Sequence, residues 1–322
     1  MSASTIELRN LVVDYSTASG TTRAVDALSL SIATGEVYAL LGENGAGKTS
    51  TIEVLEGHRA RTAGDVVVLG VDPANRGSAG RQMRDRIGVV LQTSGLEREV
   101  TVRESVALFS SVYRNPRSLE EVLALVGLTD VVDQRVGTLS GGQRRRLDLG
   151  LAVVGRPEVL FLDEPTTGFD PSARHQAWEL ITSLRSDGTT VLLTTHYLDE
   201  AEHLADRVGV LSHGRLLLEG RPSDLVRASA ATDIVVRTGD ARTIDSAAID
   251  SLHERLEGVA ATMDQQGSEL RVSSVETSRA LEVLTQWSNE FNVALDDWSI
   301  ERPTLEQVFL KVTESAERHV DE

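Results

Sequence analysis

The chain has 322 residues, of which 40% are hydrophobic and 25% are charged, with a formal net charge of -17 and no cysteine. The length favours about two domains, and the lack of cysteine excludes disulfides, thiolate metal sites and cysteine nucleophiles. The acidic balance argues against nucleic acid as a partner, because phosphate binding needs a concentrated basic surface. No secretory signal and no apolar run of roughly 20 residues is found, so we expect no transmembrane segment.

The first two-thirds of the chain alternates short apolar strands with amphipathic helices. This order predicts an α/β fold with a mostly parallel sheet that is covered on both faces. Near-continuous Val, Leu and Ile runs predict its buried strands at Glu36–Leu41, Ile87–Leu91, Val159–Leu162 and Thr190–Thr194. Alternating patterns predict an antiparallel side sheet from Thr5–Asp14, Ala24–Ile32 and Asp65–Leu69.

The stretch from Val102 to Val154 has little strand pattern and predicts a helical insert. Further on, Arg207–Leu211 and Arg215–Glu219 flank Ser-His-Gly, which predicts a hairpin. After about Ala228 the pattern changes, so we predict a first domain of residues 1–228 and a second of residues 229–322.

The second domain is predicted to follow the order β-α-β-β-α-β of ferredoxin-like domains. Its strands are expected near Asp233–Arg237, Val259–Met263, Glu269–Val272 and Ala294–Ile300. Its helices are expected over Ile244–Leu256 and Thr277–Glu290, with a last helix over Thr304–Thr313. A merely helical extension is the alternative.

A glycine-rich octet follows the strand Val37–Leu41 and precedes a helix predicted over Lys48–Leu55. It matches the P-loop pattern G-x-x-x-x-G-K-[ST], and with the next residue it comprises Gly42, Glu43, Asn44, Gly45, Ala46, Gly47, Lys48, Thr49 and Ser50. The glycines let the backbone point its N–H groups at phosphate oxygens, and the helix N-terminus adds a favourable dipole. Lys48 can reach the β- and γ-phosphates, and the Thr49 hydroxyl can bind Mg²⁺. A glycine-rich turn that only caps a helix is the alternative.

Two acids, Asp163 and Glu164, end the apolar strand that begins at Val159. The strand delivers them to the same sheet edge as the P-loop. We expect Asp163 to bind the metal ion and Glu164 to orient the attacking water, since phosphoryl transfer needs mainly positioning and charge stabilisation. A solvated acidic pair at a strand end is the alternative.

The pentapeptide Leu139-Ser140-Gly141-Gly142-Gln143 lies between these two motifs. Ser140 and the two glycines are predicted to begin a helix. The Ser140 hydroxyl and the bare amide groups at this helix start make a second anion site. With the P-loop before it and Asp-Glu after it, this segment resembles the signature of ABC ATPases. The resemblance implies two domains that dimerise head to tail, with each signature capping the ATP γ-phosphate held by its partner.

The resemblance also assigns roles to single residues at strand ends. Gln92 resembles the glutamine that contacts Mg²⁺ and senses the membrane partner, and His196 resembles the switch histidine at the γ-phosphate. Tyr15 resembles the aromatic residue that stacks on adenine, with a packed strand-end aromatic as the alternative. Asp170, after Gly168 and Phe169, resembles the loop that touches the opposite protomer.

The basic run Arg144–Arg146 follows the signature, and we interpret it chiefly as a solvated helix face. The catalytic residues implied by all these motifs are Glu164, His196 and Lys48.

The tail Ile300–Thr313 (IERPTLEQVFLKVT) and the segment Leu139–Ala152 resemble drug-exporting ABC subunits of the daunorubicin-resistance type. The resemblance implies an ATPase that uses ATP and Mg²⁺, works as a homodimer or with a similar subunit, and powers an integral membrane permease. The chain would then lie at the cytoplasmic face of the membrane. A helix of the permease would enter a groove formed by Thr93–Ser105 and the helices after it.

Three other functions are weighed against export. An ATP-binding regulator without turnover is disfavoured because Glu164 and His196 are both present. Importer ATPases commonly carry a different, often barrel-like C-terminal module, which the predicted β-α-β-β-α-β order disfavours. ABC proteins that act on nucleic acid or ribosomes carry long coiled coils, zinc modules or two fused ATPase units. This chain has one copy of each motif and no cysteine.

Overall fold

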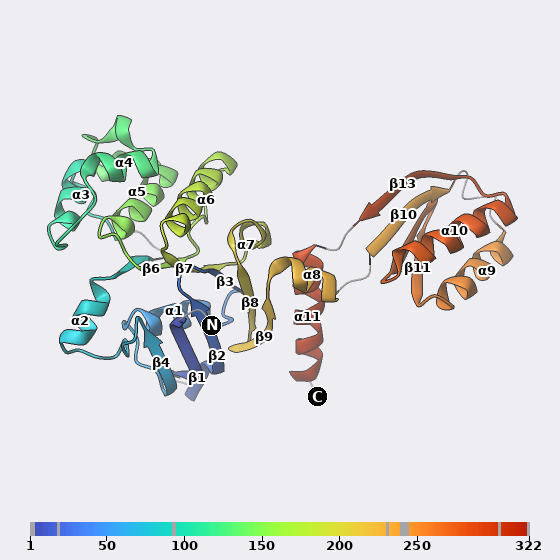
Figure 1. The fold of residues 1–322 in the computed structure, drawn as a ribbon, viewed down its shortest axis with the longest axis horizontal. Helices are drawn as coiled ribbons and strands as arrows, with labels where there is room; N and C mark the ends of the chain where they lie inside the picture. Colours follow the sequence, from blue (N-terminus) through green and yellow to red (C-terminus); the bar gives the residue numbers. More distant parts are fainter. Residues whose placement is uncertain are drawn as a thin grey trace. The chain divides into compact units, whose positions relative to one another are not determined.

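The computed structural model describes residues 4–17, 20–91, 95–229, 232–238, 245–301 and 304–320. The chain forms two compact units (Figure 1). Unit 1 comprises Met1–Pro222 together with Val312–Glu322, and unit 2 comprises Ser223–Lys311. Among the described helices, none has the length and apolar character needed to cross a membrane.

A six-stranded sheet forms the centre of unit 1. Its strands are β3 (Val37–Leu41), β5 (Ile87–Val90), β6 (Val159–Asp163), β7 (Thr190–Thr195), β8 (Arg207–Ser212) and β9 (Arg215–Gly220). They lie in the order β5-β6-β7-β3-β8-β9 and are parallel, except that β9 pairs antiparallel with β8. Every residue of β3, β6 and β7 is buried, as expected for strands covered on both faces. The predicted parallel sheet and hairpin are therefore confirmed.

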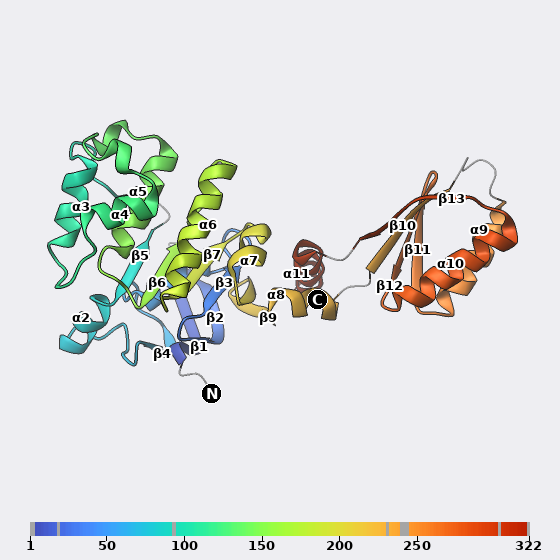
Figure 2. The ribbon, with the colours of Figure 1, turned by 45° about the horizontal axis from the view of Figure 1, so that its top comes forward.

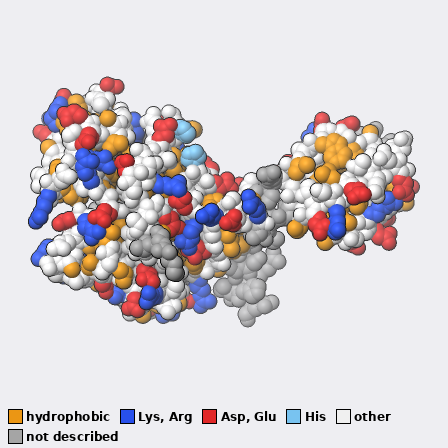
Figure 3. Space-filling model, in the orientation of Figure 1, with side chains coloured by type: hydrophobic (Ala, Val, Ile, Leu, Met, Phe, Trp, Pro, Cys, Tyr) orange, Lys and Arg blue, Asp and Glu red, His pale blue; other side chains and the backbone are white. Residues whose placement is uncertain are grey.

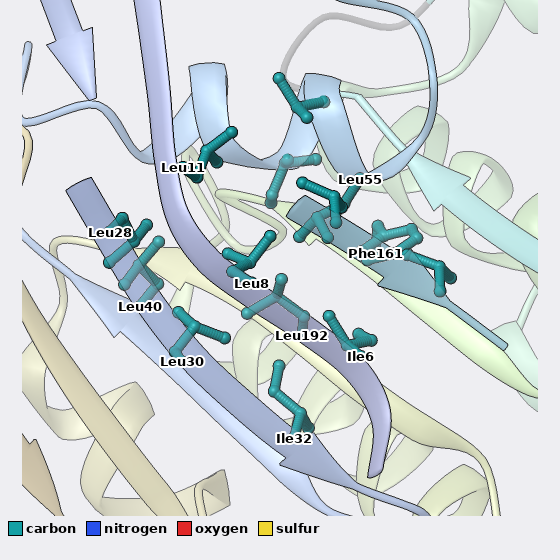
Figure 4. Packing of buried hydrophobic residues seen from close by; sticks show 14 of the residues in the cluster. Ile6, Leu8, Leu11, Leu28, Leu30, Ile32, Leu40, Leu55, Phe161 and Leu192 are labelled. Carbon is teal, nitrogen blue, oxygen red and sulfur yellow. The ribbon is translucent and has the colours of Figure 1, made fainter. Parts of the chain in front are cut away.

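The antiparallel side sheet is confirmed as well. It contains β1 (Ser4–Thr17), β2 (Gly20–Ala33) and β4 (Ala63–Val68), in the order β2-β1-β4. Figure 4 shows Ile6 and Leu8 of β1 in one packed cluster with Leu40, Phe161 and Leu192 of the central sheet. The helix after the P-loop, α1 (Lys48–Leu55), buries its apolar side chains in the same core, which holds the start of the helix in place.

The remaining helices of unit 1 include the predicted helical insert. They are α2 (Ser78–Arg84), α3 (Val102–Ser110), α4 (Leu119–Val126), α5 (Gly141–Val153), α6 (Pro171–Ser186) and α7 (Leu198–Leu204), with 3₁₀ turns at Thr129–Val131 and Val136–Thr138. Helices α3, α4 and α5 all begin with a capping box, which satisfies amide groups at the helix start. In Figure 1, α5 and α6 lie on the opposite face of the central sheet from β1, β2 and β4.

Charged side chains of both signs are interspersed over the described surface of unit 1 that Figure 3 presents. The exposed ion pairs of unit 1 include Arg103–Asp133 and Arg86–Glu158. Because water and salt screen such pairs, each contributes little to stability. The buried side chains between the two sheets therefore dominate the stability of unit 1.

Unit 2 has the predicted β-α-β-β-α-β order. Its elements are β10 (Thr232–Thr238), α9 (Ser246–Glu257), β11 (Ala261–Gln266), β12 (Glu269–Ser274), α10 (Thr277–Phe291) and β13 (Leu295–Glu301). The antiparallel sheet has the order β11-β12-β10-β13, which places the first and third strands side by side at its centre (Figure 2). The chain also contains α8 (Pro222–Ser229) before this module and α11 (Leu305–Val320) after it. The predicted start of α9 at Ile244 lies outside the described residues.

Trp287 of α10 organises the core of unit 2. The side chain is fully buried, and its indole Nε1 donates a hydrogen bond of 2.7 Å to the Ala248 carbonyl of α9. It packs in one cluster with Leu252, Leu256 and Leu284. The two helices are therefore joined by a buried polar contact as well as by apolar packing.

We expect Trp287→Phe to reduce the free energy of unfolding of unit 2 by about 1–3 kcal/mol, because the buried hydrogen bond to Ala248 and part of the buried ring would both be lost. Hydrogen exchange of the unit 2 strands in increasing urea would measure the change. Trp298→Phe is the matched control, since Trp298 is 43% exposed and its change should stay within about 0.5 kcal/mol. Equal effects of the two substitutions would contradict this account of the core.

Candidate active site

The loop between β3 and α1 closes around the ammonium group of Lys48. Nζ donates hydrogen bonds to the Gly42 carbonyl at 2.8 Å and the Glu43 carbonyl at 2.9 Å. Lys48 is only 4% exposed, and its burial lowers the pKa of the ammonium, although the nearby charges of Glu164, Asp163 and Glu43 act in the opposite direction. A positive charge that has lost its water and is held by neutral carbonyls is suited to an anionic ligand.

Two glycines of the loop are required by close backbone contacts. A Cβ atom at Gly42 would lie 2.4 Å from the Leu211 carbonyl oxygen, and one at Gly47 would lie 2.3 Å from the Ala24 carbonyl oxygen. Gly47 also has a φ of 104°, which disfavours residues with a side chain. The loop is therefore packed closely against β2 and β8, and side chains at these two positions would displace it.

The outer side of the loop is open. Glu43, Asn44 and Gly45 are exposed, whereas Ala46 and Ser50 are buried. A Cβ atom at Gly45 would meet no heavy atom within 4 Å. Helix α1 starts here without a side-chain cap, so its first amide groups face an open cradle of the kind that binds phosphate.

Asp163 joins the P-loop to the strands beside it. Its Oδ2 accepts a hydrogen bond of 3.0 Å from the Thr49 hydroxyl, and its Oδ1 accepts one of 2.5 Å from the Thr194 hydroxyl. Among the described residues, no group of three His, Cys, Asp or Glu side chains could hold a metal ion alone. A hydroxyl and one carboxylate instead suit a small, hard cation that takes its other ligands from phosphate and water.

Glu164 continues from Asp163 into a left-handed backbone conformation, with a φ of 49°. Its N–H donates to the Thr194 carbonyl at 3.1 Å, and its Oε2 accepts a hydrogen bond of 3.3 Å from the Thr167 hydroxyl. His196 lies at the end of β7, with Nδ1 at 3.5 Å from Glu164 Oε1. The carboxylate is therefore 8% exposed and held beside an imidazole at the sheet edge that also carries Lys48.

Arg145 is the residue whose role the sequence interpretation missed. It is 8% exposed, and its guanidinium donates hydrogen bonds to the carbonyls of Asp163, Glu164, Pro165 and Leu91. Burial lowers the pKa of Arg145, and the surrounding carbonyls and carboxylates compensate for the lost water. The prediction of a solvated basic face is therefore wrong for this residue.

The neighbouring arginines are also less solvated than predicted. Arg144 and Arg146 are both partly buried, and Arg146 Nη1 donates to the carbonyls of Val126 and Gly127. The basic run thus serves mainly to attach α5 to the segments around it, because each guanidinium is directed at main-chain oxygens. The apolar residues Leu147 and Leu149, which follow the three arginines and are buried, were the available signal that this part of α5 is packed against other segments.

Tyr15 is attached to the helix that follows the P-loop. Its hydroxyl shares a hydrogen bond of 2.7 Å with the Ser50 hydroxyl, and the Arg59 guanidinium lies 4.2 Å from the centroid of its ring. Arg59 is in turn held by Glu53 at 2.5 Å. The ring is therefore oriented by α1, beside the phosphate cradle, and stacking on adenine stays a prediction.

The signature residues lie apart from the P-loop in the fold, at the start of α5. Ser140 Oγ accepts a hydrogen bond from the Gln143 amide at 3.2 Å, and Gln143 Oε1 accepts one from the Ser140 amide at 2.9 Å. A Cβ atom at Gly141 or Gly142 would meet nothing within 4 Å, so this helix start is open.

Asp170 caps α6 by accepting a hydrogen bond of 2.9 Å from the Ala173 amide. Gln92 lies outside the described residues. The carbonyl of its neighbour Leu91 accepts a hydrogen bond from Arg145. The structure thus brings Lys48, Thr49, Asp163, Glu164 and His196 to one edge of the central sheet, and it leaves the signature on the helical insert.

The fold and this arrangement define a P-loop ATPase domain with a helical insert. The ABC transporter family matches residues 25–167 of the chain. The daunorubicin resistance ATP-binding protein DrrA3 of Streptomyces coeruleorubidus is 38% identical, with 91% of this chain and 92% of the relative covered. The Nod factor export ATP-binding protein I of Burkholderia orbicola is 42% identical, with 73% and 77% covered.

A solved structure agrees with these relatives. The dimeric, post-hydrolysis state of the ATP-binding cassette MJ0796 bound to ADP and Pi aligns with a TM-score of 0.62 and 25% identity, and covers 67% of this chain and 98% of that one. The chain belongs to the ABC transporter family, and it is an ATP-binding ATPase of that family.

We expect Arg145→Lys to reduce the kcat for ATP hydrolysis by about 10-fold or more while the Kd for ATP changes by less than about threefold. A lysine cannot reach all the carbonyls at once, so the backbone under Glu164 would be less well oriented, whereas the P-loop would be unchanged. Steady-state ATPase kinetics and binding of a fluorescent ATP analogue would separate the two quantities. Arg144→Lys is the control, and a similar loss in both variants would argue against a specific role for Arg145.

Proposed function

We propose that this chain supplies the power for export of a drug-like or lipid-like compound through a separate membrane permease. The relatives named for daunorubicin resistance and Nod factor export support this proposal, since 91% of this chain is covered by the first and 73% by the second. In such a system the permease binds the cargo. This chain would be attached to the permease at the cytoplasmic face of the membrane. The cluster of Lys48, Asp163, Glu164 and His196 carries the proposal of ATP hydrolysis.

Two copies of the chain, or one copy and a similar subunit, would form the complete site. The open α5 start at Gly141 and Gly142 supports this view, because bare amides at a helix N-terminus attract an anion and no phosphate cradle of the same copy adjoins them. The signature of one copy would then contact the γ-phosphate in the P-loop of the other. Asp170, at the start of α6, would face the second copy.

Each residue of the site has a proposed task in the reaction. The P-loop amides and Lys48 bind the phosphates, and Tyr15 orients the adenine. Glu164 orients the attacking water. His196 contacts both the Glu164 carboxylate and the γ-phosphate, and so fixes their relative position. Mg²⁺, held by Thr49, Asp163 and Gln92, would neutralise charge on the phosphate oxygens.

A groove on unit 1 supports a permease as the partner. It has a volume of about 390 Å³, and it lies among the end of α1, β5, α3 and α5. Apolar side chains form much of its wall, including Leu91, Leu96, Phe109 and Leu151. Leu91 is 50% exposed and Phe109 is 39% exposed, so apolar surface is available to a helix of another protein.

Glu164→Gln tests the proposed chemistry. The substitution preserves the shape of the side chain but removes its charge, so we expect ATP turnover to fall by about 10²–10⁴-fold while ATP still binds. With Mg·ATP present, light scattering should detect an accumulated dimer. Glu158→Gln is the control, because Glu158 is an exposed acid just before the same strand. Wild-type turnover by Glu164→Gln would show that another group orients the water.

Co-extraction tests the proposed partner. We expect this chain to purify in detergent with a co-expressed candidate permease, and Phe109→Glu to abolish the complex by placing a charge in the groove. Val112→Glu should not affect the complex, since Val112 is 72% exposed on the segment after α3 and does not line the groove. Recovery of the wild-type chain only in free form would count against a permease partner.

A further inference from the structure

Glu56 is a buried acid that the proposed reaction does not use. It follows α1, is 2% exposed, and its Oε2 lies 2.9 Å from Nδ1 of His58. Its other carboxyl oxygen, Oε1, is buried and has no hydrogen-bond partner. Most buried polar atoms in proteins do have a partner, so this oxygen calls for an explanation in terms of a ligand or a partner protein.

The oxygen without a partner belongs to a residue that lines the groove proposed for the permease. The wall around it is mainly apolar, with Leu96, Phe109 and Leu151 among the lining side chains. Asp148 is the second acid of the lining, and Arg84 is its one arginine. The groove therefore combines apolar surface with an acidic group that is buried at its wall.

Burial makes this acid sensitive to a positive neighbour. Loss of water, together with the charges of Asp163 and Glu53, raises the pKa of Glu56 to about 8. The charged form is therefore disfavoured in the chain alone. A cation placed beside the carboxyl group would favour the charged form, and its N–H groups would supply the missing donor.

We propose that the partner helix entering this groove carries one arginine or lysine on an otherwise apolar face, and that this side chain pairs with Glu56. The proposal rests on the permease as the occupant of the groove, and it adds the chemistry by which the groove selects its helix. A fully apolar helix would leave Oε1 without a donor. An acidic helix would bring a like charge to Asp148 and would further disfavour the charged form of Glu56.

Arginine fits this position better than lysine. Its planar guanidinium can donate to a carboxylate and to a nearby carbonyl at the same time, and it is more weakly hydrated than an ammonium group. The long apolar stem of either side chain would pack against the groove wall, which suits a lining with aromatic groups at Phe109 and Tyr113.

The test uses the full chain and a pair of stapled amphipathic helical peptides. Both have an apolar face of leucine and alanine, and they differ only at its centre, where one carries arginine and the other carries citrulline, which has nearly the same shape without the charge. Binding is followed by the methyl NMR signals of Leu96 and Leu151. We expect the arginine peptide to bind about tenfold more tightly than the citrulline peptide.

Glu56→Gln should reduce this ratio to within about twofold, because the amide preserves the size of the side chain but not its charge. Glu97→Gln is the matched control, since Glu97 is an exposed acid close in sequence to Leu96 that does not line the groove, and its ratio should stay near tenfold. If Glu56→Gln does not fold, the ratio measured on the wild-type chain decides alone, and a value near one overturns the proposal.

The outcomes separate this proposal from the one on which it rests. Equal binding of both peptides to the groove would overturn the pairing with Glu56 but leave the groove as a docking surface. Binding of neither peptide would overturn the pairing and remove the groove as the permease site. A tenfold ratio that persists in Glu56→Gln would place the cation on another acid, such as Asp148, and would also overturn the pairing.

Discussion

The chemistry of this protein depends on three adjacent parallel strands that are buried along their whole length. β6, β7 and β3 run in the same direction in the centre of the sheet, so their carboxyl ends lie at one edge. One strand leads into the P-loop, one ends in Asp163, and one ends next to His196. Because the apolar side chains on both faces fix the strands, the polar groups at their ends are positioned without needing a ligand to gather them.

A buried guanidinium connects this edge to the helical insert. Arg145 lies one turn into the helix that the signature opens, and its hydrogen bonds go to carbonyls at the ends of β5 and β6. A rigid movement of α5 would therefore act directly on the backbone that carries Glu164. This contact is a physical route by which a second copy, contacting the start of α5, could influence the water-orienting carboxylate in the same chain.

Helix α1 forms the corresponding connection to the groove. Its first residue is Lys48 of the P-loop, and the residue after its last is Glu56, so one element of about 12 Å joins the phosphate cradle to the proposed docking surface. The buried face of α1 packs in the main core, which makes it a stiff connection rather than a flexible one. If the proposed partner helix occupies the groove, nucleotide binding and helix docking would be connected through this short, well-packed segment.

The sequence by itself determined the local parts of this protein. Periodicity identified the strands, the P-loop pattern placed Lys48 and Thr49 at a helix start, and the order of the motifs indicated the family, because these features depend on neighbouring residues only. The tertiary structure alone decided which side chains meet across the fold. In the sequence, nothing distinguishes Arg145 from the two arginines beside it, and Glu56 is an ordinary acid that follows a predicted helix. Arg145 is enclosed by the end of β6, and Glu56 lies beside residues of α5. No local sequence pattern shows which polar atoms are enclosed when such segments pack together.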